Sequence, residues 1–144
     1  MSIKSNLVIL LSSLILSSPA FAKDVKEPPA PGSEASDTGA KLTLAKDLLA
    51  DGIKQYNAKE YTVALKRLDT VIGMEQKNLA AFYYRGLTNK GLGKNDAAKK
   101  DFKTATTLDA PTAEDLKLRG KAFQECGQKA KADADFAKAK TLKI

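Results

Sequence analysis

The sequence contains no histidine and no tryptophan, and its single cysteine is Cys126. Every serine precedes Lys41, so residues 42–144 contain neither serine nor histidine. These absences exclude a Ser-His-acid triad, a Cys-His dyad and a histidine-ligated zinc site from that part of the chain. One cysteine also excludes an intrachain disulfide. We therefore expect no enzyme, no catalytic residues, and no metal or other cofactor.

The other reactive groups offer no alternative chemistry. Asp133 and Asp135 stand two residues apart, and residues at that spacing on a helix point to different sides. We interpret both carboxylates as solvated surface. The "GLGK" at 91–94 lacks the flanking residues of a phosphate-binding loop. Cys126 is expected to be a packed thiol that behaves as a small hydrophobe, with an intermolecular disulfide as the alternative.

The first 22 residues have the pattern of a signal peptide. Lys4 precedes an apolar run over 7–16, and Ala20-Phe21-Ala22 follows as a small-x-small cleavage site. A membrane anchor would need about 20 apolar residues, and this run is shorter. The sequence thus predicts cleavage after Ala22 and a periplasmic or secreted protein, with no transmembrane segment in the mature chain.

Residues 23–41 are predicted to form a disordered linker. Three prolines and two glycines lie among polar residues, which leaves almost nothing to bury. The whole chain has a formal net charge of +7, and the basic excess falls in residues 42–144. This excess keeps open a second functional class, a binder of polyanions such as anionic lipid, lipopolysaccharide or cell-wall polymer. We expect no nucleic-acid partner, because export removes the usual target.

Residues 42–144 repeat their own pattern with a period of 34. Six columns keep one residue type or size at this step, and a fixed period of this kind indicates stacked structural repeats. The columns are Leu48, Phe82 and Leu116; Gly52, Gly86 and Gly120; Ala64, Ala98 and Ala132; Leu68, Phe102 and Phe136; Val71, Ala105 and Ala139; and Met74, Leu108 and Leu142.

Each copy is predicted to be two helices, because apolar residues recur at three- and four-residue steps without an interrupting proline. We expect the early glycine and the alanine to allow a close helix crossing, and the following leucine or phenylalanine to fill the space between neighbouring units. Gly93 and Gly127 are expected in tight turns, where the first copy has Lys59 instead. Asn78 and Thr112 are predicted helix N-caps.

These columns, together with Tyr61 in "KEYTVAL", resemble the tetratricopeptide repeat over most of residues 43–143. The resemblance implies an all-α fold in which three antiparallel helix pairs, over 45–78, 79–112 and 113–144, stack into a right-handed superhelical solenoid. It also implies that the first helix of each pair lines a concave groove. The family often adds a final solvating helix. Here we expect the last helix, with its alternating Lys and Asp, to face water itself rather than to be covered by a partner.

By the same resemblance, eight positions line the groove. They are Leu49, Ile53, Tyr56, Tyr83, Leu87, Lys90, Lys117 and Lys121. We expect an exposed apolar patch at Tyr83 and Leu87 and a basic end at the lysines. Such a groove suits an extended or helical peptide with an apolar anchor and acidic residues. The sequence thus favours a non-enzymatic adaptor or scaffold of the bacterial periplasm or cell envelope, of undetermined oligomeric state.

Overall fold

The computed structural model describes residues 34–142, which form six α-helices and no strand. The helices are α1 (Glu34–Asn57), α2 (Tyr61–Met74), α3 (Leu79–Gly91), α4 (Asn95–Thr107), α5 (Ala113–Glu125) and α6 (Lys129–Thr141). The predicted signal peptide lies outside the described residues. None of the helices described is both long and apolar enough to span a bilayer.

Local sequence signals set the helix ends. The Asn78 side chain accepts a hydrogen bond from the Ala81 amide at the start of α3. Thr112 and Asp115 form a capping box at the start of α5, with each side chain bonding the other residue's backbone amide. These bonds satisfy amide groups that the first helical turn leaves unpaired. Both N-caps are those that the sequence predicts.

The turn inside each helix pair uses a residue with a positive φ angle at the same repeat position. Gly93 and Gly127 have φ angles of 75° and 72°, and Lys59 takes this place in the first pair with a φ angle of 63°. The backbone bonds recur too: Lys59, Gly93 and Gly127 each donate to the carbonyl three residues earlier. The first pair therefore makes the same turn, although Lys59 must adopt the left-handed backbone conformation, which is unfavourable for a residue with a side chain.

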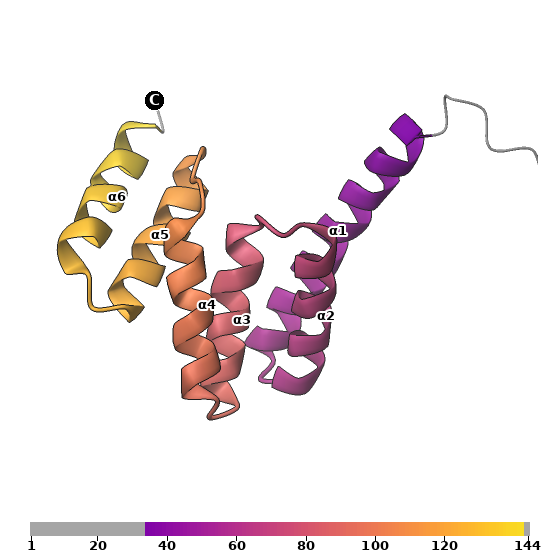
Figure 1. Ribbon diagram of the computed structural model, residues 1–144, viewed down its shortest axis with the longest axis horizontal. Helices are drawn as coiled ribbons and strands as arrows, with labels where there is room; N and C mark the ends of the chain where they lie inside the picture. Colours follow the sequence, from indigo (N-terminus) through magenta and orange to yellow (C-terminus); the bar gives the residue numbers. More distant parts are fainter. Residues whose placement is uncertain (1–33, 143–144) are drawn as a thin grey trace, which may run out of the picture. The chain divides into compact units, whose positions relative to one another are not determined.

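Helix α1 begins earlier than the sequence suggests. Residues 34–41 were expected to belong to the disordered linker, but they form the first turns of α1. The last proline before this helix is Pro31, so no residue in the segment lacks a backbone donor, and it contains good helix formers such as alanine and lysine. The result is a helix of 24 residues, whereas α2 has 14. Figure 1 shows α1 extending beyond the end of α2.

Each helix pair closes around a glycine. A Cβ atom added to Gly86 would lie 2.6 Å from the Phe102 ring, and one added to Gly120 would lie 2.6 Å from the Phe136 ring. In the first pair the smaller Leu68 side chain stands 3.1 Å from the corresponding point at Gly52. The aromatic column thus packs onto the glycine inside its own pair. Phe102 also lies in the core cluster with Leu118 and Ala122 of the next pair, so in the middle pair it fills the space between units as the sequence predicts.

A second cross-helix contact recurs beside each glycine as an ion pair between residues sixteen apart. Arg85 donates to both carboxylate oxygens of Asp101, at 3.0 and 2.6 Å, and Arg119 does the same to Asp135, at 2.7 and 2.8 Å. In the first pair the signs are exchanged, with Asp51 on α1 and Arg67 on α2, 2.9 Å apart.

The carboxylates of the second and third pairs are deeply buried. Asp101 is 3% exposed and also accepts a hydrogen bond from Asn89, and Asp135 is 7% exposed. The interpretation of Asp135 as solvated surface was therefore wrong, because the fork of Arg119 satisfies it. Asp133 is exposed and pairs with Lys129. Removing one partner of such a buried ion pair would leave the other charge uncompensated, which is strongly destabilising.

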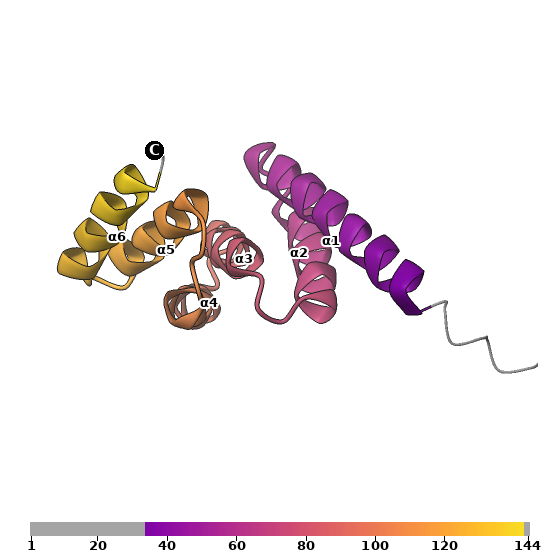
Figure 2. The same cartoon turned by 90° about the horizontal axis from the view of Figure 1, so that it is seen from above.

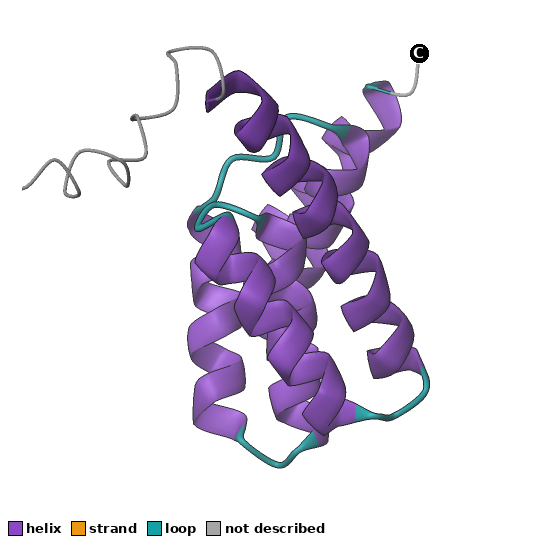
Figure 3. Cartoon of the chain, turned by 90° about the vertical axis from the view of Figure 1, so that its right-hand side faces the viewer, coloured by secondary structure: helices purple, strands orange, loops and turns teal. Residues whose placement is uncertain are grey.

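The pairs stack on one another in chain order. Helix α3 packs against α2 and α4, and α5 packs against α3, α4 and α6. One core cluster joins the middle and last pairs: its buried members are Leu79, Tyr83, Ala98, Phe102, Ala105, Leu118 and Ala122. Between the first and middle pairs, Arg85 reaches Asp69 on α2 at 2.7 Å. Figure 3 shows the short loops at the two ends of the helices.

The alanine column of the second helices is buried in all three pairs, but its members have different neighbours. Ala64 and Ala132 are fully buried, and Ala98 is 3% exposed. Ala98 belongs to the core cluster that joins the middle and last pairs, whereas Ala132 lies outside that cluster. Within residues 34–142, α6 packs against α5 alone. Ala132 is therefore buried inside the last pair, and a larger side chain there would push α6 away from α5.

This stack is an all-α helical solenoid. Figure 2 shows α1, α3 and α5 along one side and α2 and α4 along the other. We refer to the first side as the α1–α3–α5 face.

Candidate functional site

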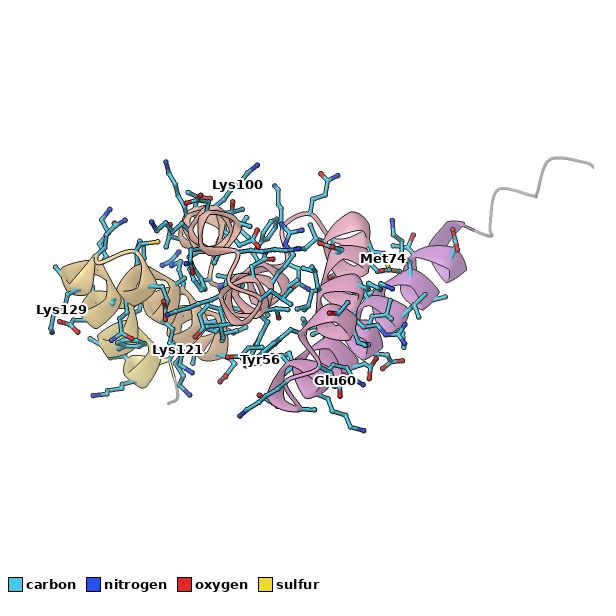
Figure 4. All side chains as sticks on the ribbon, turned by 90° about the horizontal axis from the view of Figure 1, so that it is seen from below. Tyr56, Glu60, Met74, Lys100, Lys121 and Lys129 are labelled. Carbon is cyan, nitrogen blue, oxygen red and sulfur yellow. The ribbon has the colours of Figure 1, made fainter. Side chains whose placement is uncertain are left out.

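The predicted groove residues fall into three groups by exposure. Lys90 and Lys121 are exposed, and Tyr83 is buried. The half-buried residues are Leu49, Ile53, Tyr56, Leu87 and Lys117. Figure 4 shows Tyr56 and Lys121 on the same side of the molecule, with Lys100 of α4 on the opposite side. The α1–α3–α5 face thus carries Tyr56 of α1 and Lys121 of α5 on one side of the molecule.

Tyr83 does not form the expected exposed patch with Leu87. It is 7% exposed and packs in the core cluster with Leu118 and Ala122 of the following pair. Leu87 packs against the same cluster and is half-buried. The reason is geometric: the repeat position of Tyr83 faces the first helix of the next pair, so a large ring there is covered. Tyr83 supports the stack and is removed from the candidate surface.

All four tyrosines of the chain meet in one line of rings. Tyr56 lies 5.9 Å from Tyr61 and 6.0 Å from Tyr84, and Tyr84 lies 5.4 Å from Tyr83 between ring centroids. Tyr83 continues the line to Phe102 at 6.0 Å. Tilted and edge-to-face pairs at these distances are favourable arrangements. We call these five residues the tyrosine line.

The tyrosine line fixes the first pair to the middle pair. The Tyr61 ring sits over Gly91, where an added Cβ would lie 2.7 Å from its Cζ atom, so α2 contacts the end of α3. Tyr61 and Tyr84 were missed as site residues, although the adjacent tyrosines at 83 and 84 were a signal. Burial raises the pKa of the Tyr56 hydroxyl above its ordinary value, and the neighbouring tyrosines add to this effect. The Tyr56 ring is half-buried, so one part of it packs against its neighbours and the other part is exposed to solvent.

The basic end of the face is less basic than expected. Lys90 Nζ lies 2.8 Å from Glu125 Oε2, so this lysine is paired across α3 and α5. The hydrogen bond that it donates to Glu125 raises the pKa of Lys90. The side chains are 56% and 30% exposed, and such a surface pair contributes little stability. Glu125 was not among the predicted site residues. Lys121 is exposed and has no ion pair to any residue within 34–142.

A pocket of about 310 Å³ lies beside this ion pair, between α3, α4 and the end of α5. Phe102 and Ala98 supply its apolar lining, and Lys90, Lys99, Asn95 and Glu125 supply polar groups. This size is near the lower end of the range for small-molecule sites, roughly 300 to 1,000 Å³. It suits one anchoring side chain better than a whole cofactor.

The described part of the chain has no group of three or more His, Cys, Asp or Glu residues able to hold a metal ion. Cys126 is a free, half-buried thiol that packs against the core cluster. Burial raises the pKa of this thiol, which disfavours the reactive thiolate form. The candidate site is built from apolar, aromatic and lysine side chains.

Comparisons with known proteins find similarity among solved structures. No protein-family model matches the chain, and no curated protein matches it. Among solved structures the chain is similar to the crystal structure of MamA, with 20% sequence identity and a TM-score of 0.46. The match covers 69% of this chain and 58% of MamA, so the chain spans less than two thirds of that protein's length.

Proposed function

We propose that this chain is a non-enzymatic protein-interaction module of the bacterial periplasm or cell envelope. In this proposal residues 45–78, 79–112 and 113–144 are three tetratricopeptide repeats. Their α1–α3–α5 face binds a peptide or helix of a partner protein, and the chain acts as an adaptor or scaffold. The observation that carries the proposal is a strip along the first helices. Half-buried Ile53 and Leu87 and exposed Lys121 share one repeat position, and half-buried Tyr56 lies one turn after Ile53.

The chemistry of this strip suggests the kind of ligand. Ile53, Tyr56 and Leu87 keep part of their apolar surface in water, so a ligand that covers them gains roughly 25 cal/mol per Å² of apolar area. The tyrosine line holds the face in place, which lowers the ordering cost of binding. Lys121 favours an acidic residue in the ligand.

Site-specific photocrosslinking tests this proposal. A photoreactive residue at Lys121 is expected to capture a partner from native envelope material, saturably and in competition with unlabelled protein. The same group at Lys100 on α4 is the matched control, because it is exposed on the opposite side. Leu87→Ser should weaken capture at position 121 while helicity stays unchanged. Equal capture at both positions, or capture indifferent to Leu87→Ser, would count against the proposal.

Export has a separate test. Expression of the full chain followed by cell fractionation should place the mature protein in the periplasm or the medium, with Lys23 as its first residue by mass spectrometry. A lysine substituted for Ala22 should block the cleavage, since signal peptidase needs a small residue there. A cytoplasmic protein that retains its first 22 residues would contradict this part of the proposal.

A second candidate function, binding to an anionic envelope polymer or lipid surface, is favoured by helix α4. Lys99, Lys100 and Lys103 are exposed on it, and none has an ion pair to a residue within 34–142. Binding to phosphatidylglycerol vesicles should then fall steeply with salt and be lost on changing all three lysines to glutamate. Leu87→Ser should leave it unchanged, which separates this function from the first.

A further inference from the structure

The surface of the last helix pair carries an open apolar pocket of about 430 Å³. It is lined by Lys117 of α5 and by Phe136, Ala139 and Lys140 of α6. Leu142, just beyond the end of α6, is 49% exposed. This surface does not fit the expectation that the last helix is polar enough to face water alone. We call it the α6 edge.

The repeat identifies what such a surface contacts elsewhere in the molecule. One period earlier the same positions are Tyr83, Phe102, Ala105 and Thr106. In the middle pair, Tyr83, Phe102 and Ala105 are buried in the core cluster under Leu118 and Ala122 of α5. The first pair follows the same rule, since Leu68 and Val71 are fully buried and α2 packs against α3. Among the described residues, only the third copy of this surface has no helix over it.

We propose that the α6 edge docks an acidic amphipathic helix of a partner protein, seated as α5 is seated on the middle pair. Such a helix presents a leucine and an alanine four residues apart, as Leu118 and Ala122 do. The charges of the rim select the partner. Lys117 and Lys140 replace Tyr83 and Thr106, and Lys140 has no ion pair to any residue within 34–142. Lys117 has only a 3.5 Å contact with exposed Glu114.

A second copy of this chain fits the surface poorly. Its helix equivalent to α5 is α1, which carries Ala50 and Lys54 at the places of Leu118 and Ala122. Docking would bury the Lys54 ammonium beside Lys117 and Lys140, and unpaired buried charges of one sign are strongly unfavourable. Two α6 edges facing each other would also oppose their lysines. Charge complementarity therefore favours a foreign acidic helix over self-association.

A helix-stapled, fluorescein-labelled peptide tests the docking. The peptide copies residues 112–126, keeps Leu118 and Ala122, and carries K117E, R119E and K121E to make it acidic. We expect saturable binding to the full chain by fluorescence anisotropy. The double variant Lys117→Glu, Lys140→Glu should weaken binding by about tenfold or more, since two rim contacts become repulsive. The matched control Lys100→Glu, Lys103→Glu should change it little, and circular dichroism checks that both variants keep the fold.

Other outcomes would overturn the proposal. The proposal is wrong if the stapled peptide fails to bind. It is also wrong if a polyglutamate peptide of the same charge competes equally well, because that result indicates generic polyanion binding. Concentration-dependent dimers in sedimentation that block the peptide would assign the edge to a second copy. Binding seen only after proteolytic removal of residues 1–33 would assign it to the chain's own segment. Leu87→Ser should leave peptide binding unchanged, so this test is independent of the α1–α3–α5 face.

Discussion

Adding one methyl group at different helical glycines should change the unfolding free energy in opposite directions. Gly73 lies in α2, and a Cβ atom added there meets nothing within 4 Å. Gly86 lies in α3, and its Cβ would stand 2.6 Å and 2.8 Å from two atoms of the Phe102 ring. Both changes gain helix propensity, but only the second forces a buried ring to move.

The magnitudes follow from these two effects. Replacing an exposed helical glycine by alanine stabilises a helix by up to about 1 kcal/mol, which is the expectation for Gly73→Ala. Overpacking costs about 1 to 3 kcal/mol, and subtracting a propensity gain of about 1 kcal/mol leaves Gly86→Ala destabilised by up to about 2 kcal/mol. Phe102 is 3% exposed and touches Tyr83, which leaves its ring little room to yield. Gly52→Ala should cost less than Gly86→Ala, because the nearest atoms of the facing Leu68 lie at 3.1 Å from the added Cβ rather than at 2.6 Å.

Urea unfolding, monitored by circular dichroism at the helix band, measures the unfolding free energy of each variant. In thermal unfolding, a change of 1 kcal/mol shifts the melting temperature of a domain this size by roughly 4 to 8 °C. A double-mutant cycle adds a sharper test. Phe102→Leu gives the middle pair the glycine–leucine contact of the first pair, so it should relieve much of the cost of Gly86→Ala. The reasoning is refuted if Gly86→Ala is as stable as Gly73→Ala, or if the two effects at 86 and 102 simply add.

Three further predictions concern the turns, the buried ion pairs and the tyrosine core. Lys59→Gly should stabilise the chain by up to about 1 kcal/mol in urea unfolding, because position 59 has a positive φ angle that glycine adopts easily. Gly93→Ala should destabilise the chain by a similar amount for the same reason. Changes of unfolding free energy in the same direction would contradict this. Asp101→Asn should lower the unfolding free energy by about 3 kcal/mol or more, because it leaves the partly buried Arg85 without its main partner. The exposed control Asp133→Asn should change it by less than about 0.5 kcal/mol. Similar losses of unfolding free energy in the two variants would contradict the difference in burial. Burial raises the pKa of Tyr83 from 10.0 to about 12, so the folded chain keeps a proton that the unfolded chain releases, and the unfolding free energy should fall as pH rises through that window. Ultraviolet absorbance should show that the last tyrosine to titrate is lost in Tyr83→Phe, and a titration unaltered by that change would exclude the assignment.

Much of the helix-pair architecture could be predicted because its contacts impose the same size on the same column in every copy. Gly86 and Gly120 must be glycine where a ring lies against them, and such a requirement is visible when the sequence is compared with itself. The ion pairs beside them were missed for the opposite reason. Asp51 and Arg85 occupy one column with opposite charges, so a search for preserved residue types does not find it, although the spacing of sixteen is constant.

The candidate surface was harder to predict because exposure depends on the neighbouring pair as well as on the residue. Leu49, Tyr83 and Lys117 share one repeat position, yet Tyr83 is buried by the following helix and Lys117 lines an open pocket. Lys90 was counted as a free charge because its partner Glu125 lies one pair further along the chain. A linear pattern gives the position on a helix, but what covers that position is a property of the stack.

The exchanged signs of the first ion pair have a consequence for how the chain reaches its native arrangement. Hairpins of similar shape could trade helices during folding, within one chain or between two. If α1 took α4 as its partner, Asp51 would oppose Asp101, and if α3 took α2, Arg85 would oppose Arg67. Both exchanges place like charges in contact beside a glycine crossing, so they are penalised where the native partners attract. The exchanged charges thus distinguish the first hairpin from the second. The glycine crossing does not, because it is the same in both hairpins.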